Sequence, residues 1–199
     1  MLSADIDLAL VRRFFSRADA AQASDFLRRE IASRMHEKLE LINISASRVL
    51  DAGCGLGADL PHLLSRFPKA QIVGLDGSCA ALCEQQAMQQ AADQAKITLW
   101  QKILPRALQT QVVSEVQLLC ADFAQLGIAS NTIDVLWSNM ALHWHPQPDL
   151  VLAEWRRVLN VNGMLMFSCF GPDSLREVRT AFQDVDNYPH VLPFVDMHD

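Results

Sequence analysis

Long apolar runs are missing from this sequence of 199 residues. None of its hydrophobic stretches approaches the roughly 20 residues that a membrane-spanning helix needs, so we expect no membrane segment. Residues 1–7 carry acids where a secretory signal would carry bases. These two absences together favour a cytoplasmic protein.

Basic residues are also scarce. Lys and Arg together number 17 against 23 Asp and Glu, and the formal net charge is −6. Broad nucleic-acid binding usually requires a basic patch, so this balance argues against it. Half of the residues are hydrophobic, which is enough to build a sizeable core in a single domain.

No Cys-x-x-Cys pair occurs among the five cysteines, which are Cys54, Cys79, Cys83, Cys120 and Cys169. Their odd number and their spacing indicate neither a disulfide framework nor a zinc site. We therefore expect free, buried thiols.

The most informative segment is 49–57, which reads Val-Leu-Asp-Ala-Gly-Cys-Gly-Leu-Gly. It predicts a buried strand over 48–51 that ends in a glycine-rich turn and leads into a helix. The glycines allow the backbone to turn tightly and to approach a ligand more closely than a Cβ would permit. The turn lacks the Lys-Ser/Thr pair that binds a triphosphate and Mg²⁺, which excludes a P-loop.

Two acids indicate which ligand this turn would bind. Asp51 places a carboxylate where a pyrophosphate would lie, which disfavours a dinucleotide and favours a cationic ligand without phosphate. S-Adenosylmethionine, a sulfonium with an amino-acid tail, is such a ligand. Asp76 ends a second predicted strand, 70–76, about 20 residues after the glycines, where a carboxylate binds ribose hydroxyls.

The second half of the chain predicts three further strands, over 116–123, 133–139 and 164–170, with a turn at 159–163. The first of these contains Asp122 and Phe123, which could bind an adenine amino group and cover the ring. Apolar runs separated by helical segments argue for a mostly parallel sheet that is buried on both faces. The motifs all lie at the carboxyl ends of strands, where such sheets bind ligands.

Helical spacing predicts helices over 5–17, 22–41, 59–66 and 78–94. In the second of these, Phe26, Ile31, Met35 and Leu39 are expected to face the core, while Arg28, Arg29, Glu30 and Lys38 face solvent. The first two helices are expected to cap the domain, and in that position they could also fold over the ligand. Residues 100–113 are interpreted as an inserted helical excursion, interrupted at Pro105.

Residues 45–170 resemble the class I S-adenosylmethionine-dependent methyltransferases, since five motifs occur in order. The resemblance implies an α/β, Rossmann-like sheet that ends with two strands which this sequence lacks. It also implies three groups of cofactor-binding residues. These are Asp51, Gly53, Cys54, Gly55 and Gly57 for the methionine part, Asp76, Gly77 and Ser78 for the ribose, and Asp122 and Phe123 for adenine. Ser138 and Asn139 would lie beneath the methyl donor.

A narrower resemblance rests on 12–18, 26–35, 138–144 and 170–177. These segments resemble the biotin-synthesis methyltransferases that methylate the free carboxyl of a malonyl thioester on acyl carrier protein. The resemblance implies malonyl-acyl carrier protein or malonyl-CoA as substrate. Members often carry a Tyr-Asp pair where this chain reads Ala20-Ala21-Gln22-Ala23-Ser24. Assembly factors that modify an arginine on a respiratory-complex partner are similar in the same segments, so the alternative of a protein-modifying factor stays open.

Other candidate site residues have two interpretations each. His143 and Trp144 are either walls of the substrate pocket or structural residues. Arg12, Arg13 and Arg17 form either a solvated helix face or a site for the carboxylate or phosphate of a substrate. No metal site is expected, because His143 and His145 lack a completing ligand and the terminal cluster His190, Asp196, His198 and Asp199 reads as a solvated loop.

The expected organisation is one methyltransferase domain over 1–199. It comprises a helical cap over 1–44, a cofactor-binding core over 45–170 and a carboxyl-terminal extension over 171–199 that is expected to be truncated. The last strand would then leave an exposed edge through which the chain could form a homodimer. A malonyl carboxylate is ionised at pH 7, so methyl transfer needs no general base. An arginine should bind its second oxygen, but the sequence does not identify which one.

Overall fold

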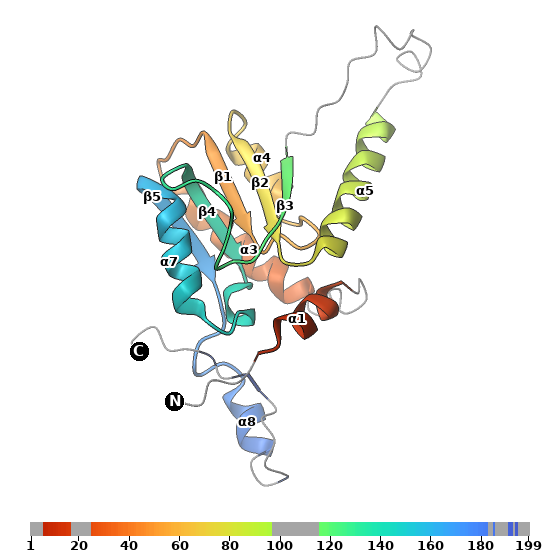
Figure 1. Cartoon of the computed structure of the whole chain (residues 1–199), viewed down its shortest axis with the longest axis vertical. Coiled ribbons are helices and arrows are strands. Elements are labelled where there is room, and N and C mark those ends of the chain that lie inside the picture. Colours follow the sequence, from red (N-terminus) through yellow and green to blue (C-terminus); the bar gives the residue numbers. More distant parts are fainter. Residues whose placement is uncertain are drawn as a thin grey trace, which may run out of the picture.

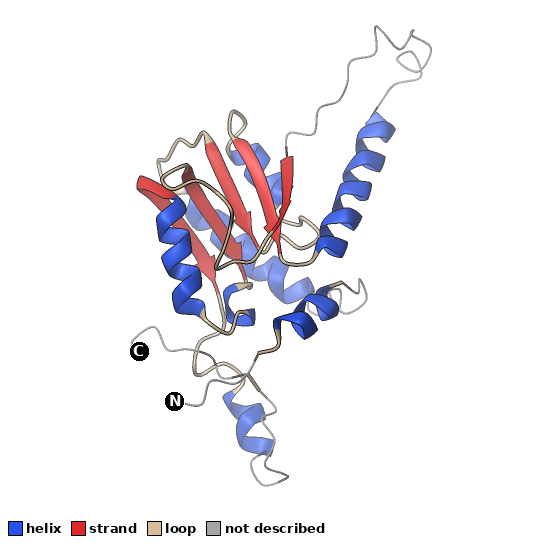
Figure 2. Cartoon of the chain, viewed as in Figure 1, coloured by secondary structure: helices blue, strands red, loops and turns tan. Residues whose placement is uncertain are grey.

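The computed structural model describes residues 6–16, 25–96, 116–182, 185, 191, 192 and 194. One five-stranded sheet forms the centre, and helices cover both of its faces (Figures 1 and 2). In chain order the elements are α1 (Leu8–Phe15), α3 (Asp25–Glu40), β1 (Arg48–Ala52), α4 (Leu60–Arg66), β2 (Gln71–Asp76), α5 (Cys79–Lys96), β3 (Val116–Cys120), β4 (Ile133–Asn139), a 3-10 turn (Leu142–Trp144), α7 (Pro148–Val158), β5 (Leu159–Ser168) and α8 (Arg176–Phe182). No helix within the described ranges is long and apolar enough to cross a membrane.

All strand pairs are parallel, and the strand order is β3-β2-β1-β4-β5. The order reverses between β1 and β4, which is where open α/β sheets form a ligand crevice beyond their carboxyl ends. Figure 1 shows α1 lying at this edge of the sheet, beyond the arrowheads of the strands. The predicted α/β, Rossmann-like fold is confirmed.

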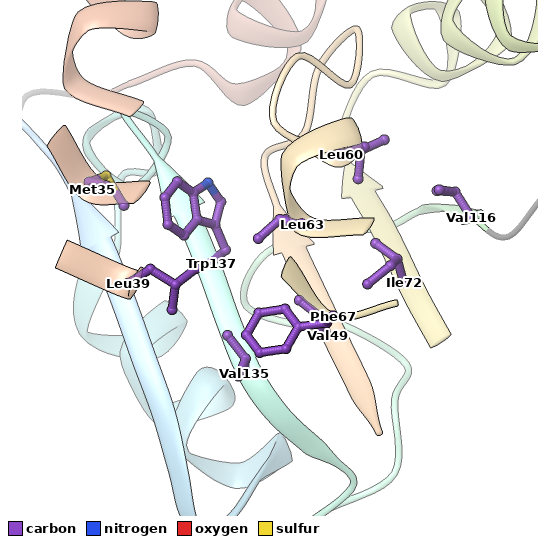
Figure 3. Close-up of a cluster of buried hydrophobic side chains, with 10 residues drawn as sticks. All are labelled: Met35, Leu39, Val49, Leu60, Leu63, Phe67, Ile72, Val116, Val135 and Trp137. Carbon is purple, nitrogen blue, oxygen red and sulfur yellow. The ribbon is translucent and has the colours of Figure 1, made fainter. Parts of the chain in front are cut away.

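The core consists of two apolar clusters, one on each face of the sheet. Successive residues of a strand point to opposite faces, so Val135 joins the first cluster and Leu136 joins the second. The first cluster brings α3 and α4 onto the sheet, and Figure 3 shows Met35 and Leu39 of α3 beside Trp137 of β4. The second brings α7 onto the opposite face through Val151, Trp155 and Val158. Burial on both faces explains why the strands read as near-continuous apolar runs.

Local sequence signals place the helix starts. The Asp7 carboxylate accepts hydrogen bonds from the backbone N–H groups of Ala9 and Leu10, which caps α1. Pro61 lies in the first turn of α4, where its missing N–H costs no helical hydrogen bond. Pro148 begins α7 in the same way.

Two predictions about elements are wrong. The predicted turn at 159–163 is the beginning of β5, because Leu159 pairs with Ile133 and a register shift accommodates the following residues. Asn162 takes a positive φ of 67° in this irregular stretch. Phe26, expected in the core, is 75% exposed, because α3 buries only positions from Ala32 onward.

The cysteine prediction is also wrong. Cys79 and Cys120 form a disulfide whose Cα atoms are 5.5 Å apart, whereas Cys54, Cys83 and Cys169 are free. Parallel pairing of β2 with β3 brings the two residues together, since Cys120 ends β3 and Cys79 follows shortly after the end of β2. The predicted excursion over 100–113 lies outside the described residues.

Candidate functional site

The glycine turn after β1 is held against the end of β2. The backbone N–H groups of Gly53 and Cys54 both donate to the Leu75 carbonyl, at 2.7 and 3.0 Å. Gly53 has a φ of +89°, and a Cβ there would lie 2.3 Å from the Cβ of Ala141. Gly55 has a φ of +52°, but a Cβ there would meet no atom within 4 Å. Gly53 is therefore needed for packing, whereas Gly55 borders open space.

Asp76, at the end of β2, organises the same turn. One carboxylate oxygen accepts the Gly55 N–H at 3.0 Å, and the other accepts the Ser78 N–H at 2.7 Å. Burial raises the pKa of Asp76, although these backbone hydrogen bonds and the nearby Arg12 oppose that rise. The carboxylate thus joins the glycine turn to the segment that leads into α5.

Asp51 lies beneath the turn and is 2% exposed. Its Oδ2 is buried and has no hydrogen-bond partner among the described residues. Burial raises the pKa of Asp51 well above its ordinary value, and the neighbouring Asp59 and Asp76 raise it further. A cation placed near this group would offset the cost of burying three neighbouring carboxylates.

Asp122 follows β3 and is bound from two sides. Arg12 Nη2 of α1 donates to its Oδ2 at 2.8 Å. The Nε2 atom of His145 lies 3.2 Å from its Oδ1, while the His145 Nδ1 accepts the Gln147 N–H at 3.1 Å. The same Nδ1 atom also lies 3.1 Å from the Gln147 carbonyl oxygen, so both ring nitrogens of His145 are held by polar partners.

The carboxyl end of β4 is also tightly bonded. The Asn139 amide donates to the Arg28 carbonyl at 3.0 Å and to Asp59 Oδ2 at 3.3 Å. Its Oδ1 accepts from the Ser168 hydroxyl of β5 at 2.9 Å. With its hydrogen-bonding groups engaged on three elements, the Asn139 side chain has one fixed orientation.

A cavity of about 100 Å³ lies between these groups and α1. The predicted site residues that line it are Gly53, Gly55, Asp76, Gly77, Ser78, Asp122, Phe123, Asn139 and Trp144. Phe14 and Phe15 of α1 pack against Trp144, with ring centroids 6.3 and 5.2 Å apart, and so cover its outer side. A larger groove of about 870 Å³ begins beside Gly53 and Gly55 and runs along α3.

Six predicted site residues that the structure describes do not line the cavity, and of these only Cys54 lines the groove. Cys54 is buried and borders the groove, and burial raises the pKa of its thiol. Gly57 faces Leu60 and Gln85, and Ser138 is buried and donates to the Ala52 carbonyl. Asp51 is buried beneath the turn, as described above, and Arg13 is exposed on α1. Arg17 lies outside the described residues.

His143 does not line the cavity. Its ring lies 4.7 Å from that of Phe170 and 5.9 Å from that of Phe194, and its Nδ1 is buried with no partner in the described part of the chain. Burial lowers the pKa of His143 to about 4. The imidazole is therefore neutral at physiological pH.

Two polar residues that line the cavity, Arg28 and His145, were not predicted from the sequence to do so. Arg28 was expected to face solvent, yet it lines both the cavity and the groove. His145 was weighed only as a metal ligand, yet it bonds Asp122 beside the cavity. The position of Arg28 in its helix did not predict this, because the backbone of Arg28 contacts Asn139, at the end of a strand more than a hundred residues away in the sequence.

The sequence profile of a family described as a methyltransferase domain matches residues 50–167. The chain belongs to this methyltransferase family. The match begins in β1 and ends in β5, so it contains the glycine turn, Asp76 and Asp122. The predicted family is confirmed.

Two curated relatives share the name malonyl-[acyl-carrier protein] O-methyltransferase. The protein from Laribacter hongkongensis is 40% identical over 195 residues, which are 97% of this chain and 61% of that protein. The protein from Gallionella capsiferriformans is 38% identical over 195 residues, covering 98% of this chain and 62% of that protein. This methyltransferase chain thus spans about three fifths of the length of these relatives.

Solved structures share the fold at lower identity. A phosphoethanolamine N-methyltransferase from Haemonchus contortus has a TM-score of 0.59 at 17% identity, and the match covers 86% of this chain and 40% of that chain. The [4+2]-cyclase SpnF has a TM-score of 0.57 at 21% identity, covering 92% of this chain and 56% of that chain. Since a cyclase shares the architecture, the fold alone does not decide the reaction.

Proposed function

We propose that this chain forms the cofactor-binding part of an S-adenosylmethionine-dependent O-methyltransferase that acts on the free carboxyl of a malonyl thioester on acyl carrier protein. The observation that carries the proposal is the cavity at the switch point of the sheet, with Asp76 and Asp122 on its wall, in a chain 40% identical to a malonyl-[acyl-carrier protein] O-methyltransferase. The methyl product would belong to biotin synthesis, as the family resemblance implies.

The described residues fit the cofactor. Asp51, whose Oδ2 has no hydrogen-bond partner among the described residues, offers a carboxyl group to a ligand whose sulfonium and amino group are both cationic. Open space beside Gly55 gives the ligand close access to the backbone. Asp76 would hold the ribose hydroxyls, and Asp122 with Phe123 would hold adenine.

The position of α1 over the cavity bears on how the cofactor would enter. The cavity of about 100 Å³ is smaller than the roughly 300–1,000 Å³ typical of ligand sites. Within the described residues, α1 buries no side chain and contacts the domain through Arg12 and through Phe14 and Phe15. We propose that α1 shifts outward to admit the ligand and then closes over it, which would exclude water from the reaction.

Methyl transfer to a carboxylate requires no acid or base from the protein. When bound, S-adenosylmethionine supplies a methyl group already activated on a sulfonium. The malonyl carboxylate is ionised at pH 7 and attacks without a general base. The task of this chain is to hold the reacting groups in line, and the fixed Asn139 side chain provides a rigid wall at the proposed methyl-donor end.

The names of the curated relatives support the proposed methyl acceptor, a malonyl thioester on acyl carrier protein. The curated proteins from L. hongkongensis and G. capsiferriformans both bear the malonyl-acyl carrier protein name. No contact within the described residues favours the alternative of a factor that modifies an arginine on a partner protein. We therefore propose the carrier-protein substrate over that alternative.

Methyl transfer from labelled S-adenosylmethionine tests the proposal. Malonyl-acyl carrier protein should accept label faster than malonyl-CoA, and free malonate should accept least. Isothermal titration with S-adenosylmethionine measures cofactor binding separately. Binding of the cofactor without transfer to either malonyl thioester would contradict the proposed substrate, and absence of cofactor binding would contradict the proposed function as a whole.

A further inference from the structure

Arg28 occupies the junction between the cavity and the groove. It lies in the first turns of α3 and lines both spaces. Its side chain is 27% exposed, whereas that of the next residue, Arg29, is 75% exposed. Arg29 borders the groove alone, whereas Arg28 also lines the cavity.

The backbone of Arg28 is fixed to the end of β4. Its carbonyl accepts the Asn139 amide at 3.0 Å, and α3 packs against β4 and β5. Asn139 lies where the methyl donor is proposed to sit. The guanidinium of Arg28 is thus carried by a main chain that is tied to the reacting end of the site rather than to its adenine end.

The carboxylates around the glycine turn would repel an anionic methyl acceptor unless a cation lay beside it. Asp51, Asp59 and Asp76 lie together there, and Asp59 and Asp76 both act on Asp51. These carboxylates favour a cationic cofactor but repel a carboxylate substrate. An acceptor that carries its own negative charge needs an opposing group beside it.

Among the described residues, Arg12 also lines the cavity, but its guanidinium is bonded to Asp122 at the opposite end. Its Nη2 bonds Asp122 at 2.8 Å, beside the proposed adenine position. Arg28 approaches Asp25 only to 3.7 Å, and Asp25 also pairs with Arg29 at 2.5 Å. A guanidinium has five N–H donors, so Arg28 can keep this contact and still bind a second carboxylate.

We propose that Arg28 binds the carboxylate of the acyl substrate and thereby selects an acid over its ester. The proposal rests on the proposed function. The guanidinium would hold one carboxylate oxygen while the other forms the bond to the methyl carbon. The carbon–sulfur bond breaks as this bond forms, its electron pair stays on sulfur, and no proton moves. Since the ester product is neutral, Arg28 loses its charged partner and the product is released more readily than the substrate.

Binding measurements on the 199-residue chain, with S-adenosylhomocysteine at saturation, test this inference. The two probes are malonyl-pantetheine and its methyl ester, which differ in the charge of the terminal group. The wild-type chain should bind the acid more tightly than the ester. Arg28→Gln should weaken acid binding roughly tenfold to hundredfold, by loss of charged hydrogen bonds, and leave ester binding unchanged.

Arg29→Gln is the matched control, because it removes the same charge from the neighbouring position and the same Asp25 partner. It should leave the preference for the acid intact. Arg28→Lys should restore part of the preference, since a charge returns without the fork of the guanidinium. Affinity for S-adenosylhomocysteine and the melting temperature report whether each variant folds. If Arg28→Gln does not fold, the acid preference of Arg28→Lys is compared with that of the wild type instead.

The inference and the proposed function can fail separately. Loss of acid preference in Arg28→Gln, in a chain that methylates some other carboxylate, would support Arg28 and overturn the malonyl-acyl carrier protein assignment. Methylation of malonyl-acyl carrier protein by a wild-type chain whose acid preference survives Arg28→Gln would overturn the role of Arg28. A wild-type chain with no preference for the acid would overturn it as well.

Discussion

Arg12 donates a hydrogen bond to Asp122 across 110 positions of sequence, at 2.8 Å. This ion pair connects α1 to the residue proposed to bind adenine. Both side chains are partly exposed, at 44% and 29%, so solvent screening keeps the contribution of the pair to stability within about 1 kcal/mol. A contact of this strength would not prevent the outward shift of α1 that we propose.

The first prediction is that Arg12→Gln loosens this cover without unfolding the protein. The melting temperature should change little, whereas S-adenosylhomocysteine should dissociate several times faster, as measured by stopped-flow displacement. Arg13→Gln is the control, because Arg13 is exposed on the same helix. Equal dissociation rates in the two variants would show that the ion pair does not retain the ligand.

The second prediction concerns Asp76. Asp76→Ala should weaken S-adenosylmethionine binding roughly tenfold to hundredfold, through loss of charged hydrogen bonds to the ribose. It should also lower the free energy of unfolding, since the Gly55 and Ser78 N–H groups lose their acceptor. Titration calorimetry and thermal unfolding separate the two effects. A folded variant with unchanged affinity would refute the ribose assignment, and the exposed Asp173→Ala serves as control.

The third prediction contrasts two glycines of one turn. Gly53→Ala should destabilise the fold strongly, because its Cβ would overlap that of Ala141 at 2.3 Å. Gly55→Ala should cost only about 1–2 kcal/mol of stability from its left-handed backbone, because its Cβ meets open space. The same Cβ would obstruct the ligand, so binding should be lost. If Gly55→Ala binds S-adenosylmethionine normally, the turn is structural only.

The fourth prediction is a pH dependence of stability due to His143. Its folded pKa of about 4 lies below the ordinary value of 6.5, so the unfolded chain binds more protons between these limits. The His143 contribution is present above about pH 6.5 and is lost as the pH falls towards 4. Denaturant unfolding at several pH values measures it. His143→Leu should flatten the dependence in this window, and an unchanged slope would contradict the assignment.

The fifth prediction concerns the disulfide. Cys79 and Cys120 are separated by 41 positions, and closing a loop of that length typically contributes about 2–4 kcal/mol. Adding a reductant should therefore lower the melting temperature of the oxidised protein by several degrees. Cys120→Ser should lower it equally and abolish the response to reductant, whereas Cys83→Ser, at an exposed free thiol, should do neither.

Local sequence patterns were sufficient to predict most strands of the sheet and the chemical character of the turn. Apolar runs predicted β1, β2 and β4 within a residue or two, because a strand buried on both faces must be apolar along its length. The glycines and the two acids after β1 and β2 were also readable, since their spacing is a local property of a strand–turn–helix unit. The beginning of β5 was not, because its irregular pairing with β4 overrides the turn-like composition of 159–163.

Only the tertiary structure decided which distant residues meet. Strand order places β3 next to β2, which joins Cys79 to Cys120. Packing of α3 on β4 and β5 places the Arg28 carbonyl against Asn139, and the position of α1 places Arg12 on Asp122. None of these pairs has a sequence period or motif, because each depends on the relative position of two elements whose packing is set by the whole core.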